Sequence, residues 1–136
     1  MRKVMVFGTF DGIHDGHRAF LREAKHHGDY LIAVVTPDYV AAHLKGKKPR
    51  ADVEKRIRML EDEGVDKAVE GDDELETWNV VKKYQPEIIA LGYDQQALKE
   101  SIEANLISFS WHPEITMLGA HQPNKYHNAL LNGQNS

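Results

Sequence analysis

The sequence contains no cysteine, which excludes a disulfide framework, a thiolate zinc site, an iron–sulfur cluster and a thiol nucleophile. This absence fits a protein of the reducing cytoplasm. Long hydrophobic runs are also missing: the apolar run that follows Arg2 and Lys3 is too short for a signal-peptide core or a membrane span. We therefore expect a cytoplasmic protein without a membrane partner.

Positive charge is in short supply as well. The 17 Lys and Arg residues are outnumbered by 21 Asp and Glu residues, which gives a net charge of −4. Generic nucleic-acid binding through a basic surface is therefore disfavoured, and any anion site has to be local. The length of 136 residues, with 41% hydrophobic residues, fits one compact domain. We expect this domain to span residues 1–131, followed by a polar tail at 132–136.

Short apolar runs alternate with longer amphipathic stretches, a pattern typical of β-α-β units around a parallel sheet. The predicted strands are Lys3–Phe7, Tyr30–Thr36, Lys67–Glu70, Glu87–Leu91 and Ile115–Leu118. The predicted helices are Gly16–His26, Asp52–Glu63, Leu75–Tyr84 and Gln95–Asn105. Two of the strands are continuously apolar, as expected of central strands covered on both faces. The fold class is therefore α/β, a single-domain, doubly wound sheet of five parallel strands.

The most informative segment runs from Gly8 to His17, between the first predicted strand and the first predicted helix. In open α/β sheets, ligands bind outside the carboxyl ends of the strands, where loop amides and the positive end of a helix dipole favour phosphate. Gly8, Gly12 and Gly16 allow close backbone approach, and His14 and His17 lie three residues apart at the helix start. The segment predicts a phosphate site flanked by two imidazoles.

Other phosphate motifs do not match this segment. It contains no G-x-G-x-x-G, and no Lys-Ser or Lys-Thr follows its glycines, so a Walker-type ATPase is disfavoured. Imidazoles in place of the P-loop lysine suit the stabilisation of charge on an α-phosphate while pyrophosphate departs. The remaining histidines lack the spacing of metal ligands, so we expect no metal site built from protein side chains.

Gly8-Thr9-Phe10-Asp11 followed by His14-x-Gly16-His17 resembles the signature of the cytidylyltransferase-like nucleotidyltransferases, which have a Rossmann-like fold. The resemblance continues through residues 44–49, 54–56, 65–68 and 86–95, which are similar to successive blocks of archaeal FAD synthases and bacterial glycerol-3-phosphate cytidylyltransferases. It covers nearly the whole chain to about residue 118.

The resemblance implies a role for each matching residue. Thr9 and Phe10 would lie near the phosphates, and His14 and His17 would hold the α-phosphate in the transition state. Lys45 would meet the outer phosphates and Arg56 a substrate phosphate. The loop residues that would contact the nucleotide are Gly92, Asp94 and Gln95. Mg²⁺ would bridge the triphosphate, and a homodimer would be a common state.

The chain departs from the family near its C-terminus, where paired hydroxyl residues and a basic residue usually help to bind the triphosphate. Asn128 can still hydrogen-bond a phosphate, whereas Ala129 has no polar group and Asn132 has no charge.

The preferred reaction is adenylylation of FMN from ATP. The alternatives are transfer from CTP to glycerol 3-phosphate or a sugar phosphate, and a non-catalytic nucleotide-binding regulatory module. The sequence alone fixes neither the base nor the acceptor.

Overall fold

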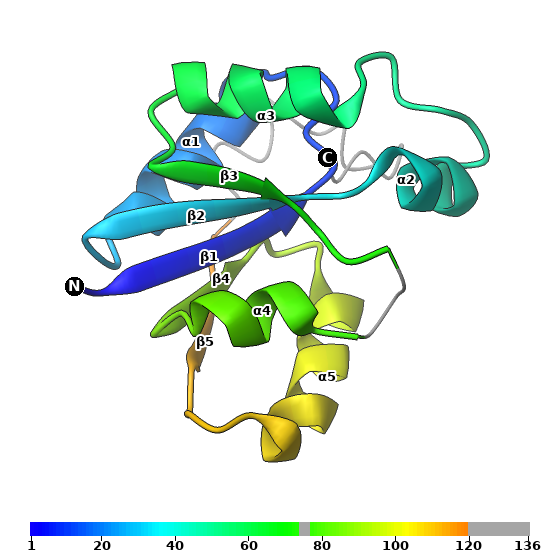
Figure 1. The fold of residues 1–136 in the computed structure, drawn as a ribbon. Coiled ribbons are helices and arrows are strands. Elements are labelled where there is room, and N and C mark those ends of the chain that lie inside the picture. The colour runs from blue at the N-terminus through cyan, green and yellow to red at the C-terminus, as the bar shows by residue number, and fades with distance from the viewer. Residues whose placement is uncertain (74–76, 120–136) are drawn as a thin grey trace.

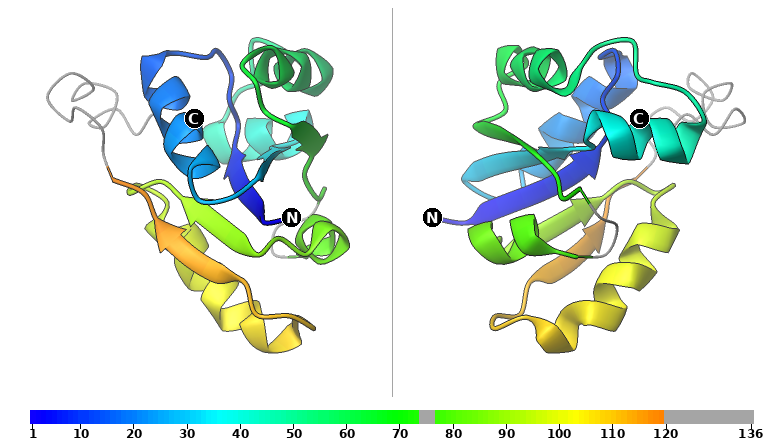
Figure 2. Two further views of the ribbon diagram at one scale, coloured as in Figure 1. Left: turned by 90° about the vertical axis from the view of Figure 1, so that its left-hand side faces the viewer. Right: turned by 45° about the vertical axis from the view of Figure 1, so that its right-hand side comes forward.

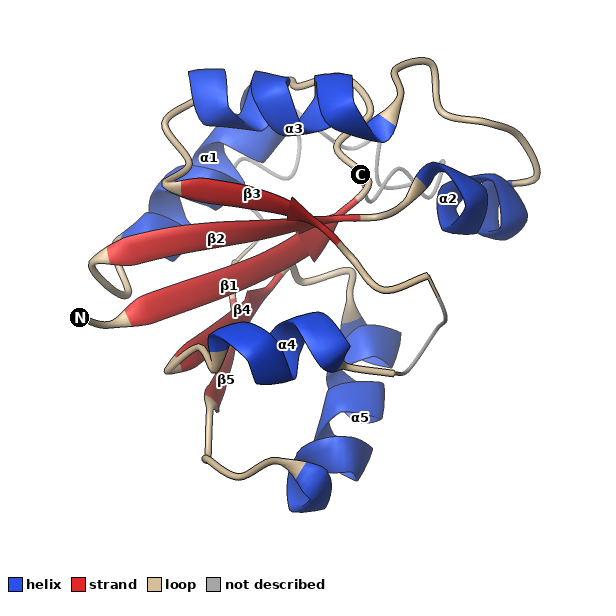
Figure 3. Cartoon of the chain, viewed as in Figure 1, coloured by secondary structure: helices blue, strands red, loops and turns tan. Residues whose placement is uncertain are grey.

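The computed structural model describes residues 1–73 and 77–119 as an α/β fold built on one parallel sheet (Figures 1 and 3). The strands are β1 (Lys3–Gly8), β2 (Tyr30–Val35), β3 (Lys67–Glu70), β4 (Ile88–Leu91) and β5 (Glu114–Met117). The helices are α1 (Asp15–Lys25), α2 (Asp38–Lys45), α3 (Val53–Asp62), α4 (Asn79–Tyr84) and α5 (Gln96–Asn105), followed by the 3₁₀ turn η1 (Leu106–Ser108). The predicted fold class and the five strands are confirmed. No helix in the described ranges is long and apolar enough to cross a membrane.

The strands lie in the order β3-β2-β1-β4-β5, and all pairs are parallel. Helices α1 and α3 cover one face, α4 and α5 cover the other, and α2 lies beyond the carboxyl ends of the strands (Figure 2). The side chains of β1 contribute alternately to the hydrophobic layers on the two faces of the sheet. Val4 and Val6 pack toward α1 and α3, whereas Met5 packs toward α4 and α5. A strand buried on both faces is the physical reason for its continuous apolar run.

The strand order reverses at β1: β2 and β3 are added on one side of it, β4 and β5 on the other. The neighbouring strands β1 and β4 diverge early. β1 pairs with β2 along its whole length, from Lys3 to Gly8. It pairs with β4 only at Val4 and Met5. The carboxyl ends of β1 and β4 are therefore separated at this switch point, which is where ligands usually bind in open α/β sheets.

Two helices differ from the sequence prediction. Helix α2 was not predicted, and its N-cap Pro37 makes no side-chain capping hydrogen bond. Helix α4 begins at Asn79 rather than Leu75, because Trp78 has a left-handed backbone with φ of 61°. The carboxylate of Asp72 accepts hydrogen bonds from the amides of Asn79 and Val80, at 2.7 and 3.2 Å, and so fixes where the helix starts. Residues 75 and 76 and the predicted tail at 132–136 lie outside the described ranges.

Candidate active site

The turn between β1 and α1 is anchored to the hydrophobic core by an aromatic side chain. Phe10 is 1% exposed and packs in the core beside α1, although its backbone has a positive φ of 54°. Gly12 has a φ of 96°, a conformation that favours glycine, and its amide donates to the carbonyl of Phe10 at 3.1 Å. With its ring buried, Phe10 can offer a ligand only its backbone. Thr9 is also buried.

The two predicted histidines meet at the start of α1 and cap it reciprocally. Nδ1 of His14 accepts hydrogen bonds from the amides of Gly16 and His17, at 3.0 and 3.4 Å. Nδ1 of His17 accepts from the amide of His14 at 3.2 Å. The two ring centroids are 3.8 Å apart. This is a capping box made of two imidazoles, and it satisfies amides that a helix start otherwise leaves unpaired.

These hydrogen bonds determine which ring nitrogen carries the proton. Because each Nδ1 accepts a backbone N–H, the neutral ring carries its hydrogen on Nε2. His14 is exposed, whereas His17 is 6% exposed and lies beside Phe10. Desolvation lowers the pKa of His14, and Arg18 adds to this effect, while Asp15 opposes it. A neutral imidazole at a helix N-terminus can donate from Nε2 to an anion at neutral pH.

Arg56 lies in the interior, where it joins the carboxyl ends of β1 and β2. Its guanidinium is fully buried, and Nη1 donates to the carbonyls of Thr9 and Thr36, each at 2.8 Å. Nε donates to the carbonyl of Ala51 at 3.0 Å, and Nη2 pairs with Asp38 at 2.6 Å. In this arrangement Arg56 positions the turn, and its predicted contact with a substrate phosphate stays a prediction.

Asp11 holds a second segment against the turn. Its carboxylate accepts hydrogen bonds from the amides of Arg50 and Ala51, at 2.8 and 3.0 Å. Desolvation acts to raise the pKa of Asp11, but these two hydrogen bonds and the nearby guanidinium groups of Arg50 and Arg56 outweigh it, so the pKa lies below its ordinary value. Asp11 therefore caps amides of a segment about forty residues away in the sequence.

The loop after β4 lies beside the carboxyl end of β1, to which one of its side chains is hydrogen-bonded. The side-chain amide of Gln95 donates to the carbonyl of Phe7 at 3.0 Å and accepts from the amide of Gly92 at 2.8 Å. It thus bridges the diverging ends of β1 and β4. A Cβ added to Gly92 would lie 2.9 Å from the carboxylate of Asp94, so a side chain here would require that carboxylate to shift. Desolvation raises the pKa of Asp94, although the residue as a whole is exposed.

The structure therefore brings Gly8, Thr9, His14, His17 and the Gly92–Gln95 loop to the carboxyl edge of the sheet. Lys45 is the last residue of α2, and its side chain lies outside the described part of the chain. Asn128 lies outside the described ranges.

Sequence reasoning missed the role of Asp38. It lies two residues after Thr36, at the carboxyl edge, but it is 18 residues from its partner Arg56. Only its position behind a buried strand could have indicated it.

Comparisons with known proteins agree with this geometry. Residues 5–120 match the model of the family described as cytidylyltransferase-like. An FAD synthase of Ferroglobus placidus is 42% identical over 107 residues, which cover 78% of this chain and 68% of the relative. An FAD synthase of Archaeoglobus profundus is 36% identical over 127 residues, covering 93% of this chain and 80% of the relative. Among solved structures, a lipopolysaccharide core biosynthesis protein of Thermoplasma volcanium has a TM-score of 0.77 and 31% identity, with 90% of this chain and 99% of that chain covered.

Proposed function

Because the chain belongs to the cytidylyltransferase-like family of nucleotidyltransferases, we propose that it transfers a nucleoside monophosphate from a nucleoside triphosphate to a small phosphorylated acceptor and releases pyrophosphate. ATP and FMN are the preferred substrates. The observation that supports this proposal is the reciprocal His14–His17 cap, whose Nδ1 contacts assign the hydrogen of each neutral ring to Nε2 at the N-terminus of α1.

The reaction requires positioning more than acid–base chemistry. A phosphate oxygen of the acceptor, already an anion, attacks the α-phosphorus, and the bond from that phosphorus to the oxygen bridging the α- and β-phosphates breaks. The electron pair of that bond leaves with pyrophosphate, so no serine, cysteine or strong general base is needed. Nε2–H groups of His14 and His17 donate to the α-phosphate oxygens as charge builds there. Lys45 and Asn128 are proposed as further phosphate contacts.

The choice of FMN and ATP rests on the relatives. Two proteins named FAD synthases are 36% and 42% identical to this chain. The family description, cytidylyltransferase-like, supports cytidylyl transfer as the alternative, for which we propose glycerol 3-phosphate or a sugar phosphate as the acceptor. A homodimer in the cytoplasm, with residues 1–131 as the catalytic domain, completes the proposal.

Mg²⁺ is the metal ion we propose, and when bound it would neutralise negative charge on the triphosphate and on the departing pyrophosphate. Within residues 1–73 and 77–119, no group of three or more His, Asp and Glu side chains is arranged to hold a metal ion. These side chains fit an ion that would be held mainly by substrate phosphates and water, as Mg²⁺ commonly is. The residues of this chain then bind the phosphates and the acceptor, rather than the ion.

The test is a matrix of four nucleoside triphosphates against FMN, glycerol 3-phosphate and several sugar 1-phosphates, with magnesium present and pyrophosphate release as the readout. We expect release with ATP and FMN. Nucleotide binding without release for any pair would instead support a non-catalytic regulatory module.

A variant of His14 separates chemistry from helix capping. Asparagine is a good N-cap residue but does not reproduce the Nε2 donor, so His14→Asn should keep its stability while losing about 10²- to 10³-fold in rate. The matched control is His26→Asn, at the other end of α1, which should keep its rate.

A further inference from the structure

The segment that leads into α3 is fixed beside the β1–α1 turn by its backbone. Asp11 accepts hydrogen bonds from the amides of Arg50 and Ala51, at 2.8 and 3.0 Å, across a sequence separation of about forty residues. Because the amide of Arg50 is held in this way, its side chain starts from a fixed point next to the turn. Removal of that side chain leaves the backbone anchor in place.

The guanidinium of Arg50 lies directly against Gly12. A Cβ built on Gly12 would be 3.3 Å from Nη2 of Arg50, closer than most side-chain contacts. The absence of a side chain at Gly12 therefore has two effects: it permits the positive φ of 96°, and it leaves room for a cation at the turn. This glycine lies two residues before His14, whose ring caps α1.

The other arginines near this turn are already paired. Arg18 donates to Asp15 and Glu63, and Arg56 pairs with Asp38. Arg50 takes part in no ion pair within the described part of the chain, and it is exposed. Its charge nevertheless acts on the turn, because it helps to lower the pKa of Asp11. A positioned guanidinium without a carboxylate partner is suited to a ligand anion.

We propose that Arg50 is a phosphate-binding residue of the site, acting from its position beside Gly12 of the β1–α1 turn. This inference rests on the proposed nucleotidyl transfer, since both substrates of that reaction carry phosphate. A guanidinium presents two parallel N–H donors that match two phosphate oxygens. The phosphate belongs either to the nucleoside triphosphate, including the pyrophosphate that leaves, or to the acceptor.

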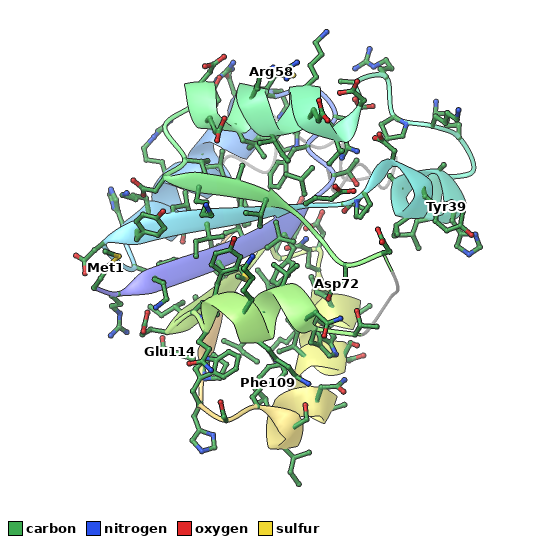
Figure 4. All side chains as sticks on the ribbon, in the orientation of Figure 1. Met1, Tyr39, Arg58, Asp72, Phe109 and Glu114 are labelled. Carbon is green, nitrogen blue, oxygen red and sulfur yellow. The ribbon has the colours of Figure 1, made fainter. Side chains whose placement is uncertain are left out.

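The experiment compares Arg50→Gln, Arg50→Lys and Arg58→Gln with the unchanged protein. Arg58 is an exposed arginine on the outer side of α3 and serves as the matched control (Figure 4). The KM values for the triphosphate and for the acceptor are measured separately with pyrophosphate release. Binding of magnesium pyrophosphate is measured by calorimetry, and circular dichroism establishes that each variant is folded.

We expect Arg50→Gln to raise one KM by about tenfold or more, since hydrogen bonds between charged groups are the strong ones. Arg50→Lys should raise that KM less, because it retains the positive charge. Arg58→Gln should leave both KM values unchanged. A raised KM for the triphosphate together with weaker pyrophosphate binding assigns the contact to the triphosphate. A raised KM for the acceptor alone assigns it to the acceptor phosphate.

Values for Arg50→Gln within twofold of the unchanged protein, for both substrates and for pyrophosphate, would overturn the proposal and leave the proposed function standing. If the unchanged protein transfers no nucleotide to any acceptor, the proposed function fails, and calorimetry decides the role of Arg50 alone. Weaker pyrophosphate binding by Arg50→Gln then supports the proposal, whereas equal binding, or no binding by the unchanged protein, overturns it.

Discussion

Replacing Arg56 by methionine would break the junction between the carboxyl ends of β1 and β2. Methionine can fill the space of the aliphatic stem, but it cannot donate to the three carbonyls or pair with Asp38. The carbonyls of Thr9, Thr36 and Ala51 would lose the guanidinium at distances of 2.8 to 3.0 Å. The variant therefore isolates what a buried cation contributes to the turn.

The expected loss follows from the burial of each partner. Removing one member of a buried ion pair costs about 3–5 kcal/mol, mainly because the other member remains desolvated. Asp38 is 43% exposed in its side chain, so its carboxylate can regain water, and the lower end of that range applies. We expect Arg56→Met to reduce the free energy of unfolding by about 3 kcal/mol, a large share of the roughly 5–15 kcal/mol typical of a domain.

Urea unfolding followed by circular dichroism is the appropriate assay. With a slope of about 1–3 kcal/mol per molar urea, the midpoint should fall by roughly 1–3 M. Arg58→Met is the matched control, because Arg58 is exposed on the same helix (Figure 4), and it should stay within about 0.5 kcal/mol of the unchanged protein. Equal midpoints for the two variants would refute the assignment of Arg56 to the junction.

Three further predictions concern other contacts. A Cβ at Gly28 would lie 2.5 Å from the carbonyl oxygen of Arg2, so Gly28→Ala should lower the stability to urea by about 1–3 kcal/mol, whereas Gly119→Ala, with open space around it, should not. The folded-state pKa of His14 lies below its ordinary value of 6.5. The contribution of this histidine to the free energy of unfolding is therefore fully present above pH 6.5 and is lost as the pH falls through the folded-state pKa. Urea unfolding of His14→Asn should lack this pH dependence. Gln95→Met removes the hydrogen bonds by which this side chain links Gly92 to Phe7. The loss should cost about 1–2 kcal/mol in urea and raise the KM for nucleotide, and an unchanged KM would mean that the bridge does not shape the site.

The strands of the sheet could be predicted from the sequence because burial on both faces requires continuous runs of apolar residues. The continuous apolar runs of β2 and β4 were found for this reason. Helix α2 has no such pattern: it begins without a side-chain cap, and its Tyr39 and Leu44 are exposed at 79% and 59%. The start of α4 depends on Asp72 and on an unusual backbone at Trp78, which no local pattern indicates.

In the site, the predictable part was the part encoded locally. His14 and His17 lie one helical turn apart, so their spacing alone indicated that they act together. The partners of Arg56 and Gln95 are set by the order of the strands, since Thr9 is 47 residues from Arg56 and Phe7 is 88 residues from Gln95. Contacts of this kind become visible only when the fold has brought distant loops to one edge.

The early divergence of β1 and β4 has a mechanical consequence. Within the described part of the chain, the backbones of these two strands pair only at Val4 and Met5. Beyond that point, their carboxyl ends are held together by side chains: core residues of both strands pack in the same two layers, and the amide of Gln95 links Gly92 to the carbonyl of Phe7. The distance between the paired imidazoles and the opposite loop is therefore set by side-chain packing and by one glutamine rather than by a backbone ladder.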